Sequence, residues 1–166
     1  GGLYRYDIND VVRVTGFYNQ TPLIGFVRKG RDVTSITGEK LHANQVIQAM
    51  EHAQSAAGLA LQHYRAFADL EKSRYAFLVE FGGATLPKEA LSCLLNELDS
   101  RLHQLNVEYA QKRESLRLGA PVLWVMKPGW FERKASSTLQ RATGDVQFKA
   151  QLLSAAPEDS SEALLI

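Results

Sequence analysis

The segment Tyr75-Ala76-Phe77-Leu78-Val79-Glu80-Phe81 is the clearest β-strand in this sequence, and Gly82-Gly83 ends it. Its aromatic and branched aliphatic residues are those that favour strands. Pro87 follows a few residues later, and proline suits the first turn of a helix. The apolar residues after it share one helical face, which predicts a helix from Pro87: Ala90, Leu91, Leu94, Leu95, Leu98 and Leu102.

Before this strand, the sequence predicts one long helix from Asn44 to about Leu70. Its apolar residues follow spacings of three and four: Val46, Ile47, Met50, Ala53, Ala57, Leu61, Tyr64 and Ala68. Gly58 lies within this pattern, and we expect it to weaken the middle of the helix by about 1 kcal/mol relative to Ala.

After the helix that begins at Pro87, three further elements are predicted: a helix over 107–118 ended by Gly119, a strand over 121–126 and a helix over 131–140. Gly144 breaks the last helix, and residues 145–153 are expected to be irregular or extended. Because helices and strands alternate irregularly, we predict an α+β fold with a small mixed β-sheet packed with helices.

The N-terminal residues 3–28 are predicted to be extended. Two β-rich runs, 11–15 and 23–27, are separated by the turn-type residues Asn19-Gln20-Thr21-Pro22, which predicts a β-hairpin. Lys29-Gly30-Arg31-Asp32 then interrupts the pattern, and Gly30 permits backbone angles that other residues avoid. We therefore place a domain boundary and hinge there.

Composition excludes some classes of function. With 166 residues and 45% hydrophobic content, the chain is long enough to bury a core as one domain with a small appendage. Its net charge is +1, from 19 basic and 18 acidic residues. The overall charge therefore does not favour binding to nucleic acid or to an anionic membrane surface. No apolar run approaches the roughly 20 residues that span a bilayer.

Cys93 is the one cysteine, so no intrachain disulfide can form. This fits a reducing compartment, and we expect a cytoplasmic protein. Because Cys93 lies among apolar leucines, we expect a buried core thiol. The histidines do not predict a metal site: His52 and His63, if on one helix face, would lie roughly 16 Å apart.

Three short segments contain residue types suited to nucleotide chemistry. Tyr4, Arg5 and Asp10 combine an aromatic for a purine, a cation for phosphate and a carboxylate for ribose hydroxyls, although a strand with solvated charged ends contains the same residues. Gly30-Arg31-Asp32 also fits an ordinary polar turn. Lys40 follows Gly38-Glu39 on a loop, and it gains a role only if an anion approaches it. No phosphate loop or nucleophile motif accompanies them, so the sequence has no complete active site of its own.

Taken in order, these segments resemble the auxin-responsive (Gretchen Hagen) acyl-acid amido synthetases of the adenylate-forming superfamily. The similarity is densest over residues 2–41. It begins with Leu3-Tyr4-Arg5-Tyr6, continues through Val14-Thr15-Gly16-Phe17-Tyr18-Asn19 and ends with Glu39-Lys40. It resumes at 121–131, which resembles the family's Lys-x-Gly-Thr-Phe-type segment, and at 144–149, which resembles its Gly-Gln-x-Lys segment.

The resemblance implies the end of a larger, two-domain enzyme. Residues 1–29 would be a strand pair of a large N-terminal domain, with a hinge at about 29–34. Residues 35–155 would form a swivelling C-terminal α+β domain. The last residues, 156–166, are expected from their polar composition to be a mobile tail. The family forms an acyl-adenylate from a carboxylic acid and ATP, with Mg²⁺, and an amino-acid amine then attacks it. The partners implied are these small molecules and the chain's own N-terminal domain, and the fragment alone would be inactive.

The resemblance also assigns roles to single residues. Asp10 would hold the ribose hydroxyls, with Tyr4 and Arg5 beside it. Lys40 would neutralise charge that develops near the adenylate. The remaining nucleotide candidates are Arg31 at the hinge, Arg28 as its substitute and Lys149 as a second catalytic cation after domain rotation.

This sequence departs from the family pattern at several positions. Asn9 replaces the glycine before the ribose aspartate, and Trp130 replaces a small hydroxyl residue, a change expected to alter the acceptor channel. Two alternatives therefore stay open: an adenylate-forming enzyme with a thiol acceptor such as coenzyme A, and a non-catalytic α+β binding module.

Overall fold

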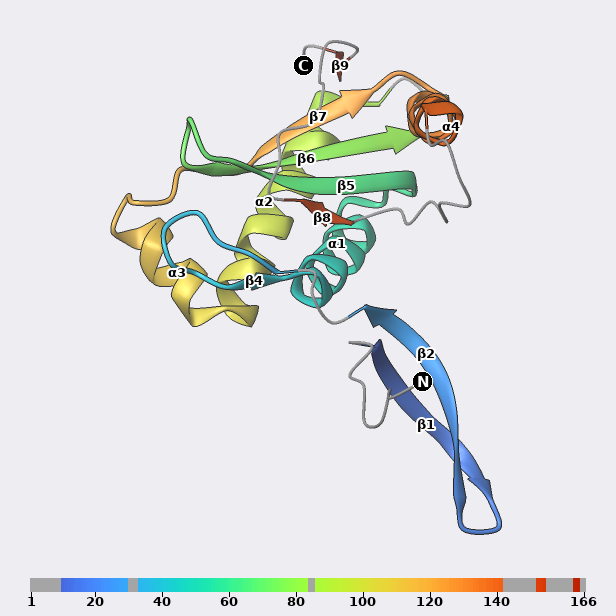
Figure 1. The fold of residues 1–166 in the computed structure, drawn as a ribbon. Helices are drawn as coiled ribbons and strands as arrows, with labels where there is room; N and C mark the ends of the chain where they lie inside the picture. Colours follow the sequence, from blue (N-terminus) through green and yellow to red (C-terminus); the bar gives the residue numbers. More distant parts are fainter. Residues whose placement is uncertain (1–9, 30–32, 84–85, 142–151, 155–162, 165–166) are drawn as a thin grey trace. The chain divides into compact units, whose positions relative to one another are not determined.

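The computed structural model describes residues 10–29, 33–83, 86–141, 152–154 and 163–164. The side chains of residues 10, 11, 26–29, 137–141 and 164 are not among those described. The chain divides into two compact units, residues 1–32 and 33–166, and each unit is described by itself (Figure 1).

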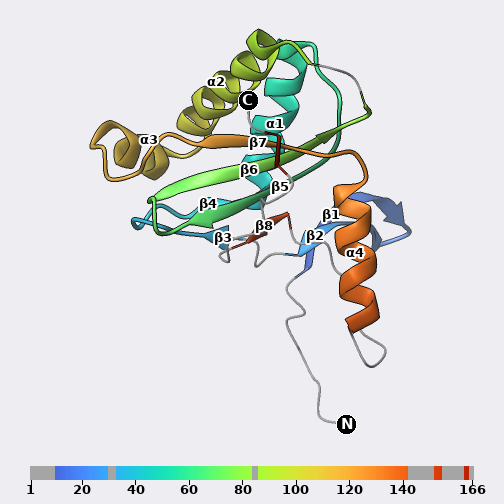
Figure 2. The same cartoon turned by 90° about the horizontal axis from the view of Figure 1, so that it is seen from above.

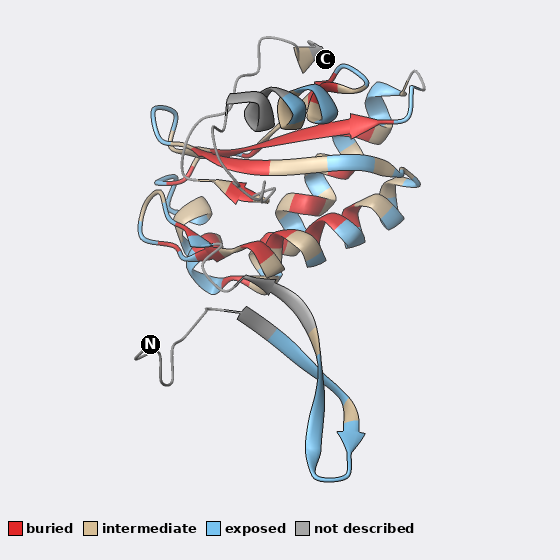
Figure 3. Cartoon of the chain, turned by 45° about the vertical axis from the view of Figure 1, so that its right-hand side comes forward, coloured by how far each residue is buried: buried red, intermediate tan, exposed pale blue. Residues whose placement is uncertain are grey.

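The first unit contains the predicted β-hairpin. Strands β1 (Asp10–Tyr18) and β2 (Thr21–Lys29) pair antiparallel, with Tyr18 opposite Thr21. Asn19 adopts a φ of 53° in the connecting turn, a conformation that asparagine tolerates better than most residues. Figure 3 shows most of the described hairpin coloured as exposed. Its exposed large apolar residues are Val12, Val14, Phe17, Tyr18, Leu23 and Ile24.

The second unit is built on a five-stranded mixed sheet in the order β8-β5-β6-β7-β9. Its strands are β5 (Leu61–Asp69), β6 (Arg74–Phe81), β7 (Val122–Met126), β8 (Leu153–Ser154) and β9 (Ala163–Leu164). Strand β6 pairs antiparallel with β5 and parallel with β7. The predicted α+β fold with a small mixed sheet is confirmed.

Helices cover this sheet on both faces (Figures 1 and 2). On one face lie α1 (Ala43–Ala57) and α2 (Lys88–Leu105), which α3 (Val107–Glu114) follows; α4 (Trp130–Arg141) lies on the other. Side chains alternate along β6, so Phe77 and Val79 join the core under α1 and α2, while Ala76 and Leu78 join the core that contains Trp130. Strand β6 is thus buried on both faces.

The prediction of one helix from Asn44 to Leu70 is wrong. Helix α1 ends at Ala57, and Gly58 takes the left-handed conformation (φ 64°) that closes it. The amide of Leu59 then donates to the carbonyl of Gln54 at 3.0 Å. Residues 61–69 form β5 instead, because they pair with β6, a contact that local spacing cannot reveal.

Replacing Gly58 with Ala is expected to lower the free energy of unfolding by about 1 kcal/mol, because a Cβ disfavours the left-handed conformation. No atom lies within 4 Å of the added Cβ, so the loss arises from the backbone alone. Urea denaturation measures it, with Gly58→Asn as the control that should lose less. An alanine variant as stable as the original chain would contradict the role of Gly58 as the helix end.

Two smaller predictions are also corrected. Cys93 is half-buried rather than a core thiol, because it projects beside the buried stripe of Leu91, Leu94 and Leu98 on α2. His63 lies on β5, so it shares no helix with His52. The helix predicted over 131–140 and the strand over 121–126 are confirmed as α4 and β7. The helix predicted over 107–118 is confirmed only as far as Glu114, where α3 ends, because the chain then turns and Leu116 takes a φ of 59°.

Some predictions fall on residues that are not described. The glycine break at Gly144 and most of 145–153 lie outside the description, although Leu153–Ser154 form β8. In the tail, Ala163–Leu164 pair with β7, and its mobility stays a prediction. Within the described part of the chain, no helix has the length and apolar character needed to cross a bilayer.

Candidate functional site

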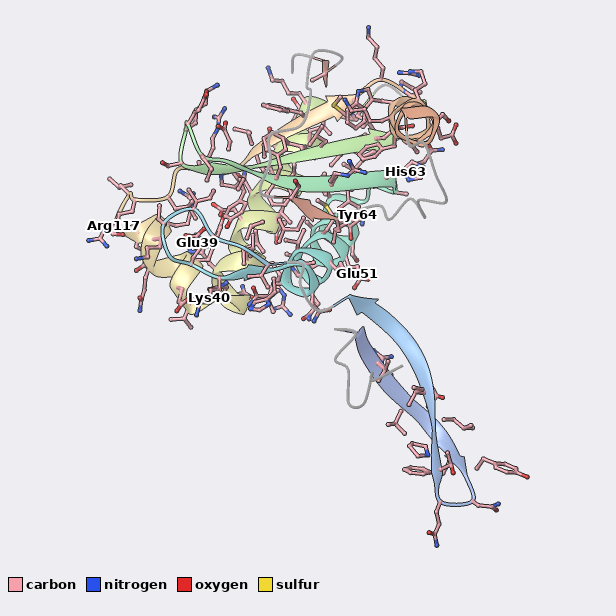
Figure 4. The ribbon with its side chains drawn as sticks, in the orientation of Figure 1. Glu39, Lys40, Glu51, His63, Tyr64 and Arg117 are labelled. Atoms are coloured by element: carbon pink, nitrogen blue, oxygen red, sulfur yellow. The ribbon has the colours of Figure 1, made fainter. Side chains whose placement is uncertain are left out.

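The exposed Lys40 is presented by a short connection at the start of the second unit. Strands β3 (Val33–Thr34) and β4 (Leu41–His42) pair antiparallel, and residues 35–40 join them. Glu39 and Leu41 are both 0% exposed, whereas Lys40 is exposed (Figure 4). Because successive residues of an extended chain face opposite sides, the burial of its two neighbours turns Lys40 outward.

The Glu39 carboxylate accepts four hydrogen bonds. Oε1 accepts from the backbone amide of Ile36 at 2.8 Å and from the Tyr75 hydroxyl at 2.6 Å. Oε2 accepts from the amide and the hydroxyl of Thr37, both at 2.8 Å. The connection is therefore folded around its own carboxylate and tied to β6 through Tyr75.

Electrostatics keep this carboxylate charged. Burial by itself would raise the pKa of Glu39, but the hydrogen bonds from Tyr75, Ile36 and Thr37 outweigh that effect and hold the pKa below its ordinary value. Burial and the contact with Glu39 raise the pKa of Tyr75, so its hydroxyl stays protonated and donates. The connection thus keeps its hydrogen bonds at neutral pH.

The backbone of Lys40 is held from the opposite side by the start of α3. Its amide donates to Glu108 Oε2 at 3.2 Å, and its carbonyl accepts from Asn106 Nδ2 at 3.0 Å. Asn106 is itself fixed, because its Oδ1 accepts from the amide of Tyr109 and caps α3. Among the described residues, no hydrogen bond or ion pair engages the Lys40 ammonium, which is free to meet an anion.

The other predicted site residues lie outside the described side chains. Tyr4, Arg5, Arg31 and Lys149 are not described at all. Asp10 and Arg28 are described as backbone only: in the hairpin, Asp10 pairs with Lys29 and Val11 with Arg28. The register therefore brings Asp10 and Arg28 to the same end of the hairpin, and their proposed roles stay predictions.

The segment 126–131 is anchored by a second buried carboxylate. Glu80, 2% exposed at the end of β6, accepts from the amide of Gly129 at 2.6 Å and from the amide of Phe131 at 3.1 Å. The Phe131 amide belongs to the first turn of α4, where the backbone lacks partners within the helix, and the Gly129 amide directly precedes that turn. Trp130 is 3% exposed and belongs to the second core, so its side chain anchors the start of α4 to the sheet.

These two segments are tied to opposite ends of one strand. Tyr75 is the second residue of β6 and Glu80 is the last but one, so their Cα atoms are about 17 Å apart along the strand. Figure 1 shows the β3–β4 connection and α4 near opposite ends of the sheet. The structure does not bring Lys40 and the 126–131 segment together.

Sequence reasoning missed the two buried carboxylates. Glu80 gave a usable signal, because a single charge inside an apolar strand needs donors to remain buried. Glu39 gave none, since its position in a polar turn is ordinary for a solvated residue. The described residues contain no group of three histidine, cysteine, aspartate or glutamate side chains arranged to hold a metal ion.

Comparison with known families matches two parts of the chain. Residues 1–29 match the GH3 family central domain, and residues 44–158 match the GH3 family C-terminal domain. The match to the central domain precedes the match to the C-terminal domain along the chain. Residues 30–43, which include Lys40, lie between the two matches.

Curated relatives carry the same family name. A probable indole-3-acetic acid-amido synthetase GH3.4 of Oryza sativa subsp. japonica is 32% identical over 164 residues, which covers 90% of this chain and 25% of the relative. A 4-substituted benzoates-glutamate ligase GH3.12 of Arabidopsis thaliana is 38% identical over 71 residues, covering 41% of this chain and 12% of the relative. The chain thus spans about a quarter of the length of the first relative.

Among solved structures, the GH3.15 acyl acid amido synthetase superposes with a TM-score of 0.82 at 24% identity. The match covers 99% of this chain and 32% of that one. At this identity the likeness establishes the fold.

Proposed function

The chain belongs to the GH3 family, and on that premise we propose that it is the C-terminal part of an ATP-dependent acyl-acid amido synthetase. The observation that carries the proposal is the match of residues 1–29 and 44–158 to consecutive domains of this family. The relatives' names support the reaction class, because they describe the joining of an acid to an amine.

In the proposed reaction, a carboxylic acid reacts with ATP to give an acyl-adenylate and pyrophosphate. An amino-acid amine then attacks the acyl carbon, and AMP leaves. Lys40 would place its ammonium beside the phosphoryl and carboxylate oxygens, where negative charge develops in the transition state. Its exposure and its backbone hydrogen bonds support this role.

The nucleotide would be held mainly by residues of the first unit. Asp10 would accept hydrogen bonds from the ribose hydroxyls, with Tyr4 and Arg5 beside it. Arg31, with Arg28 as its substitute, would contact the phosphates, and Lys149 is a second candidate cation. Mg²⁺ would be bound chiefly by the phosphates of the nucleotide, as is usual for this ion.

The same proposal assigns a separate role to each segment of the chain. Residues 1–29 would complete the preceding domain, 29–34 would act as the hinge, and 35–155 would rotate between the two half-reactions. Rotation allows different groups to face the same phosphorus in turn, and closure excludes the water that would hydrolyse the mixed anhydride. On this division, residues 1–166 alone are inactive, and the cytoplasmic location stays a prediction.

Replacing Lys40 or Asp10 with Ala in the full-length protein is expected to slow ATP–pyrophosphate exchange at least tenfold. This corresponds to about 1.4 kcal/mol of transition-state stabilisation. The measurement uses a panel of aryl and fatty acids, since the acid-binding pocket is expected to lie mainly upstream of this chain.

The control is Lys88→Ala, which removes an exposed lysine next to Pro87 at the start of α2 and should leave the exchange rate unchanged. If no acid supports exchange, the non-catalytic binding module is the better description. If exchange occurs but the acyl group passes to coenzyme A rather than to an amino acid, the thiol-acceptor alternative replaces the amide synthetase.

A further inference from the structure

Glu39 is unusual because its charged carboxylate is buried and yet is hydrogen-bonded mainly to the six-residue connection, residues 35–40, that contains it. Transfer of a carboxylate from water into the protein interior costs several kcal/mol unless hydrogen bonds replace its hydration. Here three of its four hydrogen bonds come from Ile36 and Thr37 of the same connection, and the fourth comes from Tyr75 in the core. The charge therefore determines the local backbone path more than it joins distant elements.

The connection would otherwise have considerable freedom. Gly38 adopts a φ of 104°, which few other residues reach, and Ser35, Gly38 and Lys40 are exposed. Surface connections of this kind are generally the more mobile parts of a fold. The hydrogen bonds to Glu39 fix the residues immediately before Lys40, while Glu108 and Asn106 fix Lys40 itself.

We propose that Glu39 and Tyr75 are positioning residues for Lys40: the buried carboxylate, oriented by the Tyr75 hydroxyl, fixes the backbone from which the ammonium reaches the adenylate. This inference rests on the proposed function of Lys40. Because the lysine side chain is flexible, the position of its ammonium group depends on how firmly its backbone is held. A misplacement of about 1 Å at a reacting centre costs up to a hundredfold in rate.

The chain offers a matched pair of tyrosines for the test. The Tyr75 and Tyr109 hydroxyls both donate to a carboxylate at 2.6 Å, to Glu39 and to Asp99 respectively, and both side chains are buried. Replacement by Phe removes one hydroxyl in each case and keeps the ring in the core. Only Tyr75 is tied to the Lys40 connection by its hydroxyl.

The first measurement is kinetic and uses the full-length protein. Tyr75→Phe is expected to lower kcat for amide formation about tenfold with little change in KM for ATP, whereas Tyr109→Phe leaves kcat within about twofold. In a Lys40→Ala background, Tyr75→Phe should have no further effect, because it acts through Lys40. An equal loss of kcat in both backgrounds would assign Tyr75 a general structural role and overturn the inference.

The second measurement does not depend on activity. Hydrogen–deuterium exchange of the full-length protein should become faster in the peptide spanning residues 33–41 in Glu39→Gln and Tyr75→Phe, but not in Tyr109→Phe. Unchanged exchange in that peptide would overturn the inference even if the enzyme is active. Another outcome is faster exchange in Glu39→Gln and Tyr75→Phe while Lys40→Ala keeps normal activity. That result would overturn both the positioning role of Glu39 and Tyr75 and the catalytic role proposed for Lys40. If no acid is adenylated at all, the proposed function fails, whereas the exchange data still decide whether Glu39 orders the connection.

Discussion

Replacing Glu80 with Ala is expected to lower the free energy of unfolding by about 3 kcal/mol. The buried carboxylate accepts two backbone amides, from Gly129 and Phe131, and hydrogen bonds to a charged acceptor contribute about 1.5–3 kcal/mol each. Relief of the desolvation of Glu80 offsets part of that sum. The net loss remains large because both amides are left without a partner at the start of α4.

The expected structural result is a loosened start of α4. Gly129 has a φ of 76°, and Trp130 packs against Phe67 and Leu78 in the second core, so the turn and the ring depend on the same anchor. Urea denaturation followed by tryptophan fluorescence reports the stability together with the surroundings of Trp124 and Trp130, the two tryptophans of the chain.

Two further variants make this test specific. Glu80→Gln keeps the shape and one acceptor oxygen, so it should lose about half as much stability as Glu80→Ala. Glu71→Ala removes an exposed carboxylate from the same unit and should change stability by less than about 0.5 kcal/mol. A Glu80→Ala variant as stable as Glu71→Ala would show that the carboxylate does not anchor α4.

Local sequence patterns correctly predicted the helices and strands whose type is determined by residues adjacent in the sequence. The apolar run 75–81 became β6, and the leucine stripe after Pro87 became α2. The segment 61–69 was predicted wrongly because its apolar spacing suits a helix as well as a strand. Pairing with β6 decided between the two, together with the left-handed conformation of Gly58.

In the candidate site too, the sequence predicted a residue from a short contiguous motif but not the distant residues that contact it. Lys40 was predicted from its resemblance to a family motif, because such motifs are short and contiguous. The partners that hold Lys40 come from distant elements: Tyr75 from β6, and Asn106 and Glu108 from the start of α3. No spacing in the sequence relates residues 40, 75 and 106, so only the folded chain reveals that a buried carboxylate and a helix cap fix the position of Lys40.

Replacing Asp99 with Ala is expected to cost about 3 kcal/mol of stability at neutral pH, because it dismantles the contact between α2 and α3. Asp99 accepts from the buried Tyr109 hydroxyl at 2.6 Å and pairs with Arg113 at 2.7 Å. Removing one partner of such a network leaves the others desolvated without compensation. Chemical denaturation near pH 7 measures the loss.

A neighbouring contact between a glutamate and a histidine provides the control. Glu97, on the same helix, lies 3.3 Å from His52, and their side chains are 41% and 50% exposed. Exposed pairs contribute about 0–1 kcal/mol, so Glu97→Ala should change stability far less than Asp99→Ala. If the two variants lose the same amount, burial of the Asp99 network does not determine its contribution.

The contribution of Asp99 should also depend on pH with a definite sign. Burial alone would raise the pKa of Asp99, but the hydrogen bonds from Arg113 and Tyr109, and the charges of Arg113 and protonated His103, hold it below the ordinary value of 3.8. A lowered pKa means that the stabilisation is fully present above the unfolded value and is lost as the pH falls through the folded one. The stability difference between the original chain and Asp99→Ala should therefore be constant from pH 7 to about 5 and should narrow below about pH 4. A difference that instead widens in acid would mean that the network favours the protonated carboxyl, contrary to its hydrogen bonding with Arg113.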